Sequence, residues 1–134
     1  MLFRSLSVAG AVSNAVLSID GNVGSVTVGS FLTSELFAGY HGPADGIGTF
    51  TGAFTVGPFT VKSASGGFAG SNVVATNFKN VSLASLDTAN GGVPFGFVYH
   101  GTFGGLTVKS PKLAYDKKAG GTQVLQADFE VKKV

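Results

Sequence analysis

The chain has 134 residues, of which 44% are hydrophobic and 12% are charged, and its formal net charge is +2. This composition excludes ordinary disorder, which needs low hydrophobicity and high charge, and the small net charge argues against a nucleic-acid partner. The 21 glycines, the many Val, Thr, Ser and Phe residues and the absence of Trp are typical of short strands joined by tight turns. An all-β fold in one domain is therefore expected.

Strand-like triplets recur along the chain, with two apolar residues flanking a serine or threonine. This alternation has the period of two that buries one face of a strand and leaves the other face wet. The triplets are Leu6-Ser7-Val8, Val26-Thr27-Val28, Phe54-Thr55-Val56, Phe59-Thr60-Val61, Val81-Ser82-Leu83 and Leu106-Thr107-Val108. Thr27 and Thr107 are expected to point outward. The residues expected to point inward are Val26, Val28, Phe50, Val61, Val81, Leu83, Leu106 and Val108.

The chain also repeats itself. Tyr40-His41-Gly42 recurs as Tyr99-His100-Gly101, and the triplets recur at a loose period of roughly 20–25 residues. Such a period suits a solenoid, in which each coil buries its apolar face on its neighbours, and it predicts about five or six coils. A β-sandwich or jelly roll of short strands is the alternative.

Val23–Gly29 reads VGSVTVG and is followed by Leu32–Gly39, which reads LTSELFAG. Together they resemble one coil of the large secreted bacterial β-helix (β-solenoid) repeat surface proteins. Val81–Leu83 with Asn90–Gly96 is similar to the penultimate segment of those proteins, and Ala127–Val134 is similar to their last strand. The chain thus resembles their C-terminal part. The resemblance implies a right-handed parallel β-helix, an extracellular or cell-surface location, and a structural or adhesive role.

The chain departs from that family in two respects. The stretch from Ser63 to Asn80 does not follow the repeat and is expected to be irregular, and the chain is much shorter than such surface proteins. The prediction is a single β-solenoid domain over residues 1–134, and a fragment of a longer chain is left open as an alternative to a complete protein.

Residues that could carry chemistry are few and scattered. Without cysteine, a thiolate nucleophile and a Cys-ligated metal are excluded. The only histidines, His41 and His100, have one nearby acid in Asp45, which is too little for a three- or four-ligand metal site. Asp128 and Glu130 alternate with apolar residues and are predicted to be outward polar residues rather than a catalytic pair. The sequence predicts no enzyme, no catalytic residue, no cofactor and no metal.

The first functional hypothesis is a non-catalytic extracellular structural protein that self-associates into a filament, layer or shell. A solenoid leaves unpaired backbone groups and apolar side chains on its first and last coils, and no capping helix is evident here. The last strand either pairs within its own subunit or offers a free edge to the next subunit. The expected assembly edges are formed by Leu6, Val8, Phe129, Val131 and Val134.

The alternative hypothesis is a carbohydrate- or cell-surface-binding module. Tyr40, His41, Tyr99 and His100 are the candidate surface-binding residues, and a cell-surface polysaccharide is the corresponding partner. A phage decoration or tail-component protein of jelly-roll type is a third hypothesis. The apolar stretches are interrupted by polar residues, so neither a membrane span nor a proper signal peptide is predicted.

Overall fold

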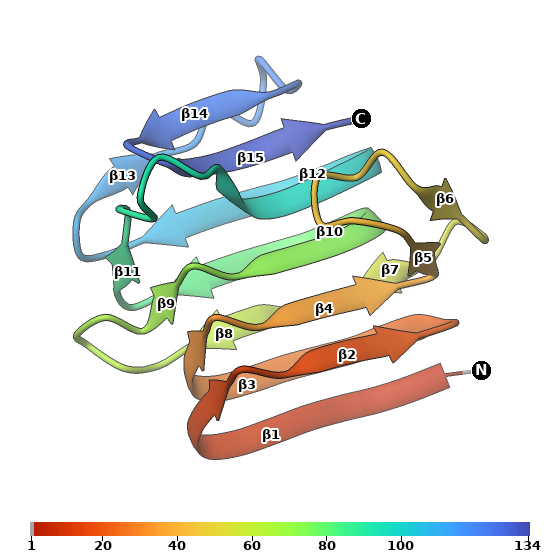
Figure 1. Cartoon of the computed structure of the whole chain (residues 1–134), viewed down its shortest axis with the longest axis horizontal. Helices are drawn as coiled ribbons and strands as arrows, with labels where there is room; N and C mark the ends of the chain where they lie inside the picture. The colour runs from red at the N-terminus through yellow and green to blue at the C-terminus, as the bar shows by residue number, and fades with distance from the viewer. Residues whose placement is uncertain (1) are drawn as a thin grey trace.

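The computed structural model describes residues 2–134. Strands make up 61% of the chain and these residues form no helix, which confirms the all-β class. The strands form one mixed sheet of 13 strands and a separate two-stranded sheet (Figure 1). The antiparallel pairs are β12–β13, β14–β15 and β5–β6, whereas the pairs that build the body of the molecule are parallel.

The elements follow one another in chain order as short and long strands. They are β1 (Leu2–Ser13), β2 (Val16–Ile19), β3 (Asn22–Leu32), β4 (Glu35–Ala38), β5 (Tyr40–His41), β6 (Thr49–Phe50), β7 (Thr55–Val56), β8 (Phe59–Val61), β9 (Phe68–Ala69), β10 (Asn72–Leu83), β11 (Leu86–Asp87), β12 (Phe95–Val108), β13 (Leu113–Ala114), β14 (Gln123–Gln126) and β15 (Phe129–Lys133).

Five segments form a row of parallel neighbours that we call the first wall: β1, β3, β8 and the C-terminal halves of β10 and β12. Their apolar triplets lie in register, so the same position of each triplet stacks on the next. One such column is Leu6, Val26, Phe59, Val81 and Leu106. The triplet pattern therefore marks the strands of this wall.

A second row of parallel neighbours lies opposite the first, and we call it the second wall. It consists of β2, β4, the N-terminal halves of β10 and β12, and β15. One inward column is Leu17, Leu36, Val73, Phe97 and Val131. Both β10 and β12 run from the second wall into the first, with a shift in their mutual register between Ala75 and Asn77. We call one pass of the chain along both walls a circuit.

The expected inward face of the first wall is largely correct. Six of the residues expected to point inward are buried, namely Val26, Val28, Val61, Val81, Leu83 and Val108. Leu106 is half-buried and packs against the same core. Thr107 is exposed, and Thr27 is half-buried. Alternation between apolar and hydroxyl residues thus identified the register of these strands.

The inward position expected for Phe50 is wrong. Phe50 lies on β6, which pairs with β5 in a hairpin that leaves the second wall and folds back over its outer face. There Phe50 packs on Tyr40 at 4.8 Å between ring centroids. Together with Val134, it covers an outer cluster whose buried members are Phe37, Tyr40, Val74 and Val98.

The stretch expected to be irregular instead contains a central strand. Within Ser63–Asn80, β9 and most of β10 are regular, and β10 has neighbours on both edges in both walls. The alternation is lost because Val73 faces the core while Val74 lies under the outer hairpin, so both faces of the strand are buried. A strand that is buried on both faces has no solvent-exposed face, so its sequence does not alternate between apolar and polar residues.

A repeated corner joins the first wall to the second. Asn14, Thr33 and Gly70 follow paired strand residues and all have positive φ, of 53°, 47° and 51°. The next residues in two of these corners are Ser34 and Ser71, which are buried. The Ser34 hydroxyl accepts from the Ala15 N–H at 3.1 Å, and the Ser71 hydroxyl accepts from the Ser34 N–H at 3.0 Å. These hydroxyls satisfy backbone groups that the corner would otherwise bury unpaired.

The core between the walls is aromatic. Phe97 is fully buried and its ring lies within 6.3 Å of the rings of five other phenylalanines, measured between centroids. Those neighbours are Phe59, Phe68, Phe78, Phe103 and Phe129. They come from strands far apart in the sequence, so Phe97 connects the later circuits.

We predict that Phe97→Ala lowers the free energy of unfolding by about 3–5 kcal/mol, because it removes a ring from a closed core and leaves a cavity. Val124→Ala is the control, since Val124 is 66% exposed and should change stability little. Denaturant unfolding measures both. Equal, small effects of the two changes would contradict the packing described here.

We also predict that Ser71→Ala lowers the free energy of unfolding by about 1–3 kcal/mol, since it leaves the buried Ser34 N–H without its acceptor. Ser18→Ala, on an exposed hydroxyl, should be close to neutral. The same unfolding assay checks the pair, and a neutral Ser71→Ala would show that the corner hydroxyls are dispensable.

Candidate functional site

The two ends of the walls differ. At the N-terminal end, β1 pairs only with β3 and β2 pairs only with β4 among the described strands. The other edges of β1 and β2 carry main-chain N–H and C=O groups with no strand beside them (Figure 1). These edges offer hydrogen bonds to any further strand.

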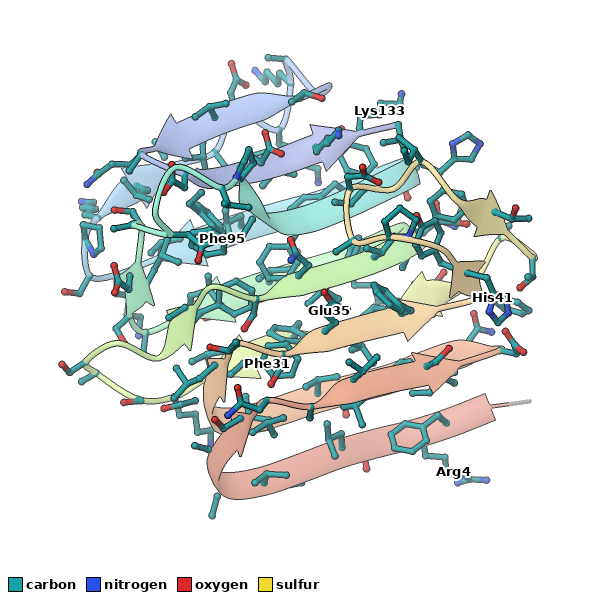
Figure 2. All side chains as sticks on the ribbon, viewed as in Figure 1. Arg4, Phe31, Glu35, His41, Phe95 and Lys133 are labelled. Carbon is teal, nitrogen blue, oxygen red and sulfur yellow. The ribbon has the colours of Figure 1, made fainter. Side chains whose placement is uncertain are left out.

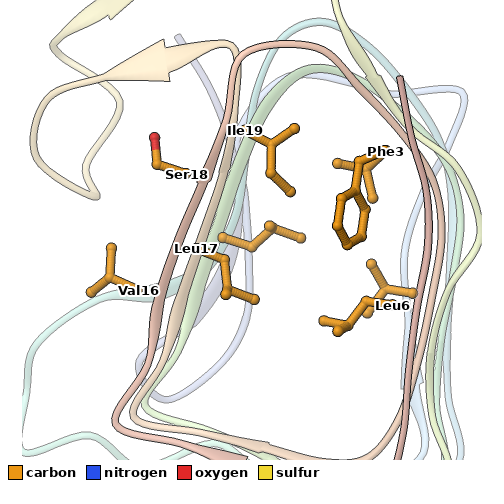
Figure 3. Close-up of a pocket in the computed structure, with 9 residues that line it drawn as sticks. Phe3, Leu6, Val16, Leu17, Ser18 and Ile19 are labelled. Atoms are coloured by element: carbon orange, nitrogen blue, oxygen red, sulfur yellow. The ribbon is translucent and has the colours of Figure 1, made fainter. Parts of the chain in front are cut away.

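An apolar cavity of about 320 Å³ opens at this end, between β1 and β2. Phe3 and Leu6 face Ile19 and Leu17 across it, whereas Val16 and Ser18 point away (Figure 3). The four facing side chains are half-buried. Their register partners one circuit inward are nearly inaccessible; three of these are Val23, Val26 and Leu36. The cavity is therefore core surface that no strand within residues 2–134 covers.

The C-terminal end is built differently, because further strands return to pair with β12 and β15. β15 pairs in parallel with β12 on one edge and antiparallel with β14 on the other, and β13 pairs with the end of β12. Phe129 and Val131 are fully buried and face the core, and half-buried Val134 packs on the outer cluster. The residues expected at this assembly edge thus lie on a strand whose two edges are both paired within the chain, and β14 is the outermost strand at this end. Leu6 and Val8, by contrast, lie on the free strand β1.

Few charges lie at the open end. Arg4 is the only charged residue of β1, β2 carries none, and Asp20 follows β2 directly. The Asp20 carboxylate lies 3.0 Å from His41 Nε2, and its side chain is still 65% exposed. Arg4 lies at the end of β1 near the N-terminus, the same end of the molecule at which β2 finishes (Figures 1 and 2). The open end therefore presents one basic and one acidic group, on opposite walls.

The tyrosines expected at the surface lie inside. Tyr40 is 1% exposed and Tyr99 is 3% exposed, so their rings do not form a surface platform. The Tyr40 hydroxyl donates to Pro43 O and accepts from the Gly48 N–H at 2.8 Å. The two Tyr-His-Gly segments are not structural equivalents, because Tyr99 faces the core beside Ala75 whereas Tyr40 belongs to the outer cluster.

The histidines are exposed but already have partners. His41 pairs with Asp20, and His100 Nδ1 lies 2.9 Å from Val134 O while its ring stacks on Phe50 at 5.1 Å. Tyr115 is half-buried beside Tyr99, and burial together with that neighbour raises the pKa of Tyr115 to about 12. Its hydroxyl is therefore neutral near pH 7.

Asp128 and Glu130 do not act as a pair. The Asp128 carboxylate accepts from the N–H groups of Asn90, at 2.6 Å, and Gly92, at 2.9 Å, and so holds the turn before β12. Glu130 instead lines a shallow groove of about 440 Å³ on the outer face of the second wall, with Glu35 and Asn72. The sequence analysis missed this groove, whose only signal was polar residues at outward positions of β4, β10 and β15.

No three His, Asp or Glu side chains within residues 2–134 come together in a way that could hold a metal ion. In the same part of the chain, no helix has the length and hydrophobicity needed to cross a membrane. Comparison with protein-family models, curated proteins and solved structures found no match for this chain.

We predict that Leu36→Ala costs about 2–5 kcal/mol of stability, and that Leu17→Ala costs clearly less in dilute solution. The two leucines occupy the same register position one circuit apart, but Leu36 is 1% exposed and Leu17 lines the open end. Unfolding at low protein concentration measures the difference. Equal costs would mean that something already covers the N-terminal opening.

Proposed function

We propose that the chain is a right-handed parallel β-solenoid of five circuits with a non-catalytic structural role, which it performs by accepting further β-strands at its N-terminal end. The two parallel walls, their in-register columns and the repeated corner support the solenoid architecture. A sandwich of short strands would be built mainly from antiparallel hairpins, which here are confined to the outer hairpin and the C-terminal cap.

The direction of winding supports the right-handed sense. In Figure 1, β2 lies nearer the viewer than β3 and runs left to right, whereas β3 runs right to left, and the chain climbs from β1 towards β15. This is also the hand that crossover connections between parallel strands adopt almost without exception.

The observation that carries the functional proposal is the contrast between the two ends. The C-terminal end is covered by β13 and β14, and the N-terminal end combines free strand edges with an open apolar cavity. Addition of a strand would satisfy the backbone groups and cover the apolar side chains together. At the C-terminal end the outermost strand of the sheet is the four-residue β14, so head-to-tail growth into a filament would have to use this short edge.

The alternative sugar-binding function loses its main support, since the Tyr40 and Tyr99 rings are buried. An extracellular or cell-surface location is part of our proposal. It rests on the resemblance of Val23–Gly39 to coils of secreted β-helix repeat proteins.

The proposal can be tested by adding one circuit. Leu2 pairs with Asn22, so residues 2–21 make one complete circuit, and a second copy of them placed before Leu2 would continue the same register. We expect the added circuit to fold onto β1 and β2, to slow hydrogen exchange of their amides, and to raise the cost of Leu17→Ala towards that of Leu36→Ala.

The control carries the same twenty residues in scrambled order, which should leave exchange of β1 and β2 unchanged. If the duplicated circuit also leaves exchange unchanged, the N-terminal end does not accept strands and the proposed function fails.

A further inference from the structure

We infer that the outer face of the first wall binds an acidic polysaccharide, a chain of hydroxyl-rich sugars that carries carboxylate or sulfate groups. The binding residues lie on the neighbouring strands β8, β10 and β12 or directly after them. The inference is separate from the strand addition proposed above, because this face points away from the core and belongs to the middle of the stack. It also uses none of the tyrosines and histidines that the sequence analysis assigned to a sugar site.

The charged side chains of the first wall all carry the same sign. None of its five strands contains an aspartate or a glutamate. Arg4 on β1 and Lys79 on β10 are basic, Lys62 and Lys109 directly follow β8 and β12, and all four side chains are exposed. No salt bridge within residues 2–134 involves any of them. This face therefore attracts anions, and its cationic groups are not already paired.

Two of the lysines flank one short side chain. The residues that directly follow the paired triplets of β8, β10 and β12 are Lys62, Ala84 and Lys109. Because adjacent strands lie about 4.8 Å apart, the two lysines are about 10 Å apart at the backbone, on either side of Ala84. Both lysines and Ala84 line a shallow hollow of about 270 Å³. Two flexible ammonium groups can therefore reach one anionic group that sits above Ala84.

A row of hydroxyl groups lies beside this pair of lysines. The middle residues of the same three triplets are register partners on the outer face, namely Thr60, Ser82 and Thr107. Thr60 and Ser82 also line the hollow between the lysines. A hydroxyl both donates and accepts hydrogen bonds, so this row suits the hydroxyl groups of a sugar. The hydroxyl row lies two residues before the lysines, which is about 7 Å along the strands.

A third lysine lies beyond the hydroxyl row. Lys79 comes five residues before Ala84, which is at most about 16 Å along β10. An added Cβ at Gly104 would lie 2.8 Å from the backbone oxygen of Lys79, so β12 brings bare backbone to this point. On the other side, Lys79 and Gly57 line a second hollow, of about 290 Å³. The face thus has cationic groups at both ends of a hydroxyl-lined track that is long enough for a short oligosaccharide.

The same face lacks the features that other large anions use. Proteins that bind single-stranded nucleic acids stack the bases on aromatic side chains. The aromatic residues of this part of the first wall all pack in the core; they are Phe3, Phe59, Phe78 and Phe103. Peripheral membrane binding inserts an apolar face, whereas the outward side chains here are hydroxyls, lysines and glycines. A hydroxyl-rich anion matches this combination of groups.

A second copy of the chain is a poorer match. Its acidic strand residues, Glu35 and Glu130, lie on the outer face of the second wall in a groove that also contains Lys132. The outer hairpin of β5 and β6 folds over the same face and makes it uneven. A flat sheet face therefore does not reach those carboxylates without meeting the hairpin.

Titration calorimetry of the full chain with polygalacturonate, dextran sulfate and uncharged dextran tests the inference. We expect at least one charged polymer to bind and uncharged dextran not to bind. Lys62→Glu/Lys109→Glu should weaken binding roughly tenfold or more, since it replaces two attractions with repulsions. Lys117→Glu/Lys118→Glu makes the same change in net charge at two exposed lysines between β13 and β14, and it should change the affinity less than about twofold.

The charged polymers distinguish the two sources of the anionic group. Binding of polygalacturonate alone assigns carboxylates, binding of dextran sulfate alone assigns sulfates, and binding of both shows that either group is accepted; each result supports the inference. If neither polymer binds, or if the two lysine pairs lose affinity equally, the inference is overturned.

The hydroxyl row has its own test. Thr60→Val/Thr107→Val keeps the shape and charge of the face but removes two hydroxyls, so it should weaken binding roughly twofold to tenfold and leave the salt dependence unchanged. An unchanged affinity would show a plain anion patch and overturn the assignment to a sugar polymer.

The other occupants are also outcomes of these measurements. Tighter binding to double-stranded DNA or to vesicles of anionic phospholipid than to both charged polysaccharides overturns the inference. Light scattering compares the mass of the parent chain with that of Lys62→Glu/Lys109→Glu, and we expect equal masses. A larger mass for the parent would identify a second copy as the occupant of this face and overturn the inference as well.

Discussion

Parallel backbone pairing between successive circuits is the interaction on which the structure depends. In each wall, a strand between two neighbours has its N–H and C=O groups satisfied on both edges, and β10 and β12 extend this pairing through both walls. The pairing also determines which strands are left with an unpaired edge. A stack of parallel strands satisfies every strand except the first and the last, so the two ends must be covered by something other than the repeat itself.

In-register pairing places like residues above one another, and this builds the core. The register partners Phe31 and Phe68 stack at 5.9 Å between ring centroids, and the register partners Phe95 and Phe129 pack at 5.6 Å. The same close spacing forbids side chains at some positions. At Gly96, where φ is +138°, an added Cβ would lie 2.1 Å from the backbone oxygen of Glu130 on the neighbouring strand. The glycine-rich composition thus serves, in part, the close approach of β12 to β15.

The two ends of the stack differ in how their outermost strands are paired. β13 and β14 return to pair with β12 and β15, whereas no strand within residues 2–134 lies beside the outer edges of β1 and β2. An apolar cavity beside free strand edges combines the hydrophobic effect with directional hydrogen bonds, and this combination favours a partner that is itself a strand. The low charge of β1 and β2 places no electrostatic barrier in its way.

The sequence by itself determined the strand class and the inward face of the first wall, because alternation such as Val26-Thr27-Val28 is a local property of a strand with one wet face. It could not determine the second wall, where Val73 and Val74 are both buried and no alternation survives. It also could not show that Tyr99 lies in register with Ala75 rather than with Tyr40. Only the tertiary structure decided which strand edges are paired, because pairing depends on whether a strand distant in the sequence reaches the edge. Thus β12 reaches one edge of β15 and β14 reaches the other.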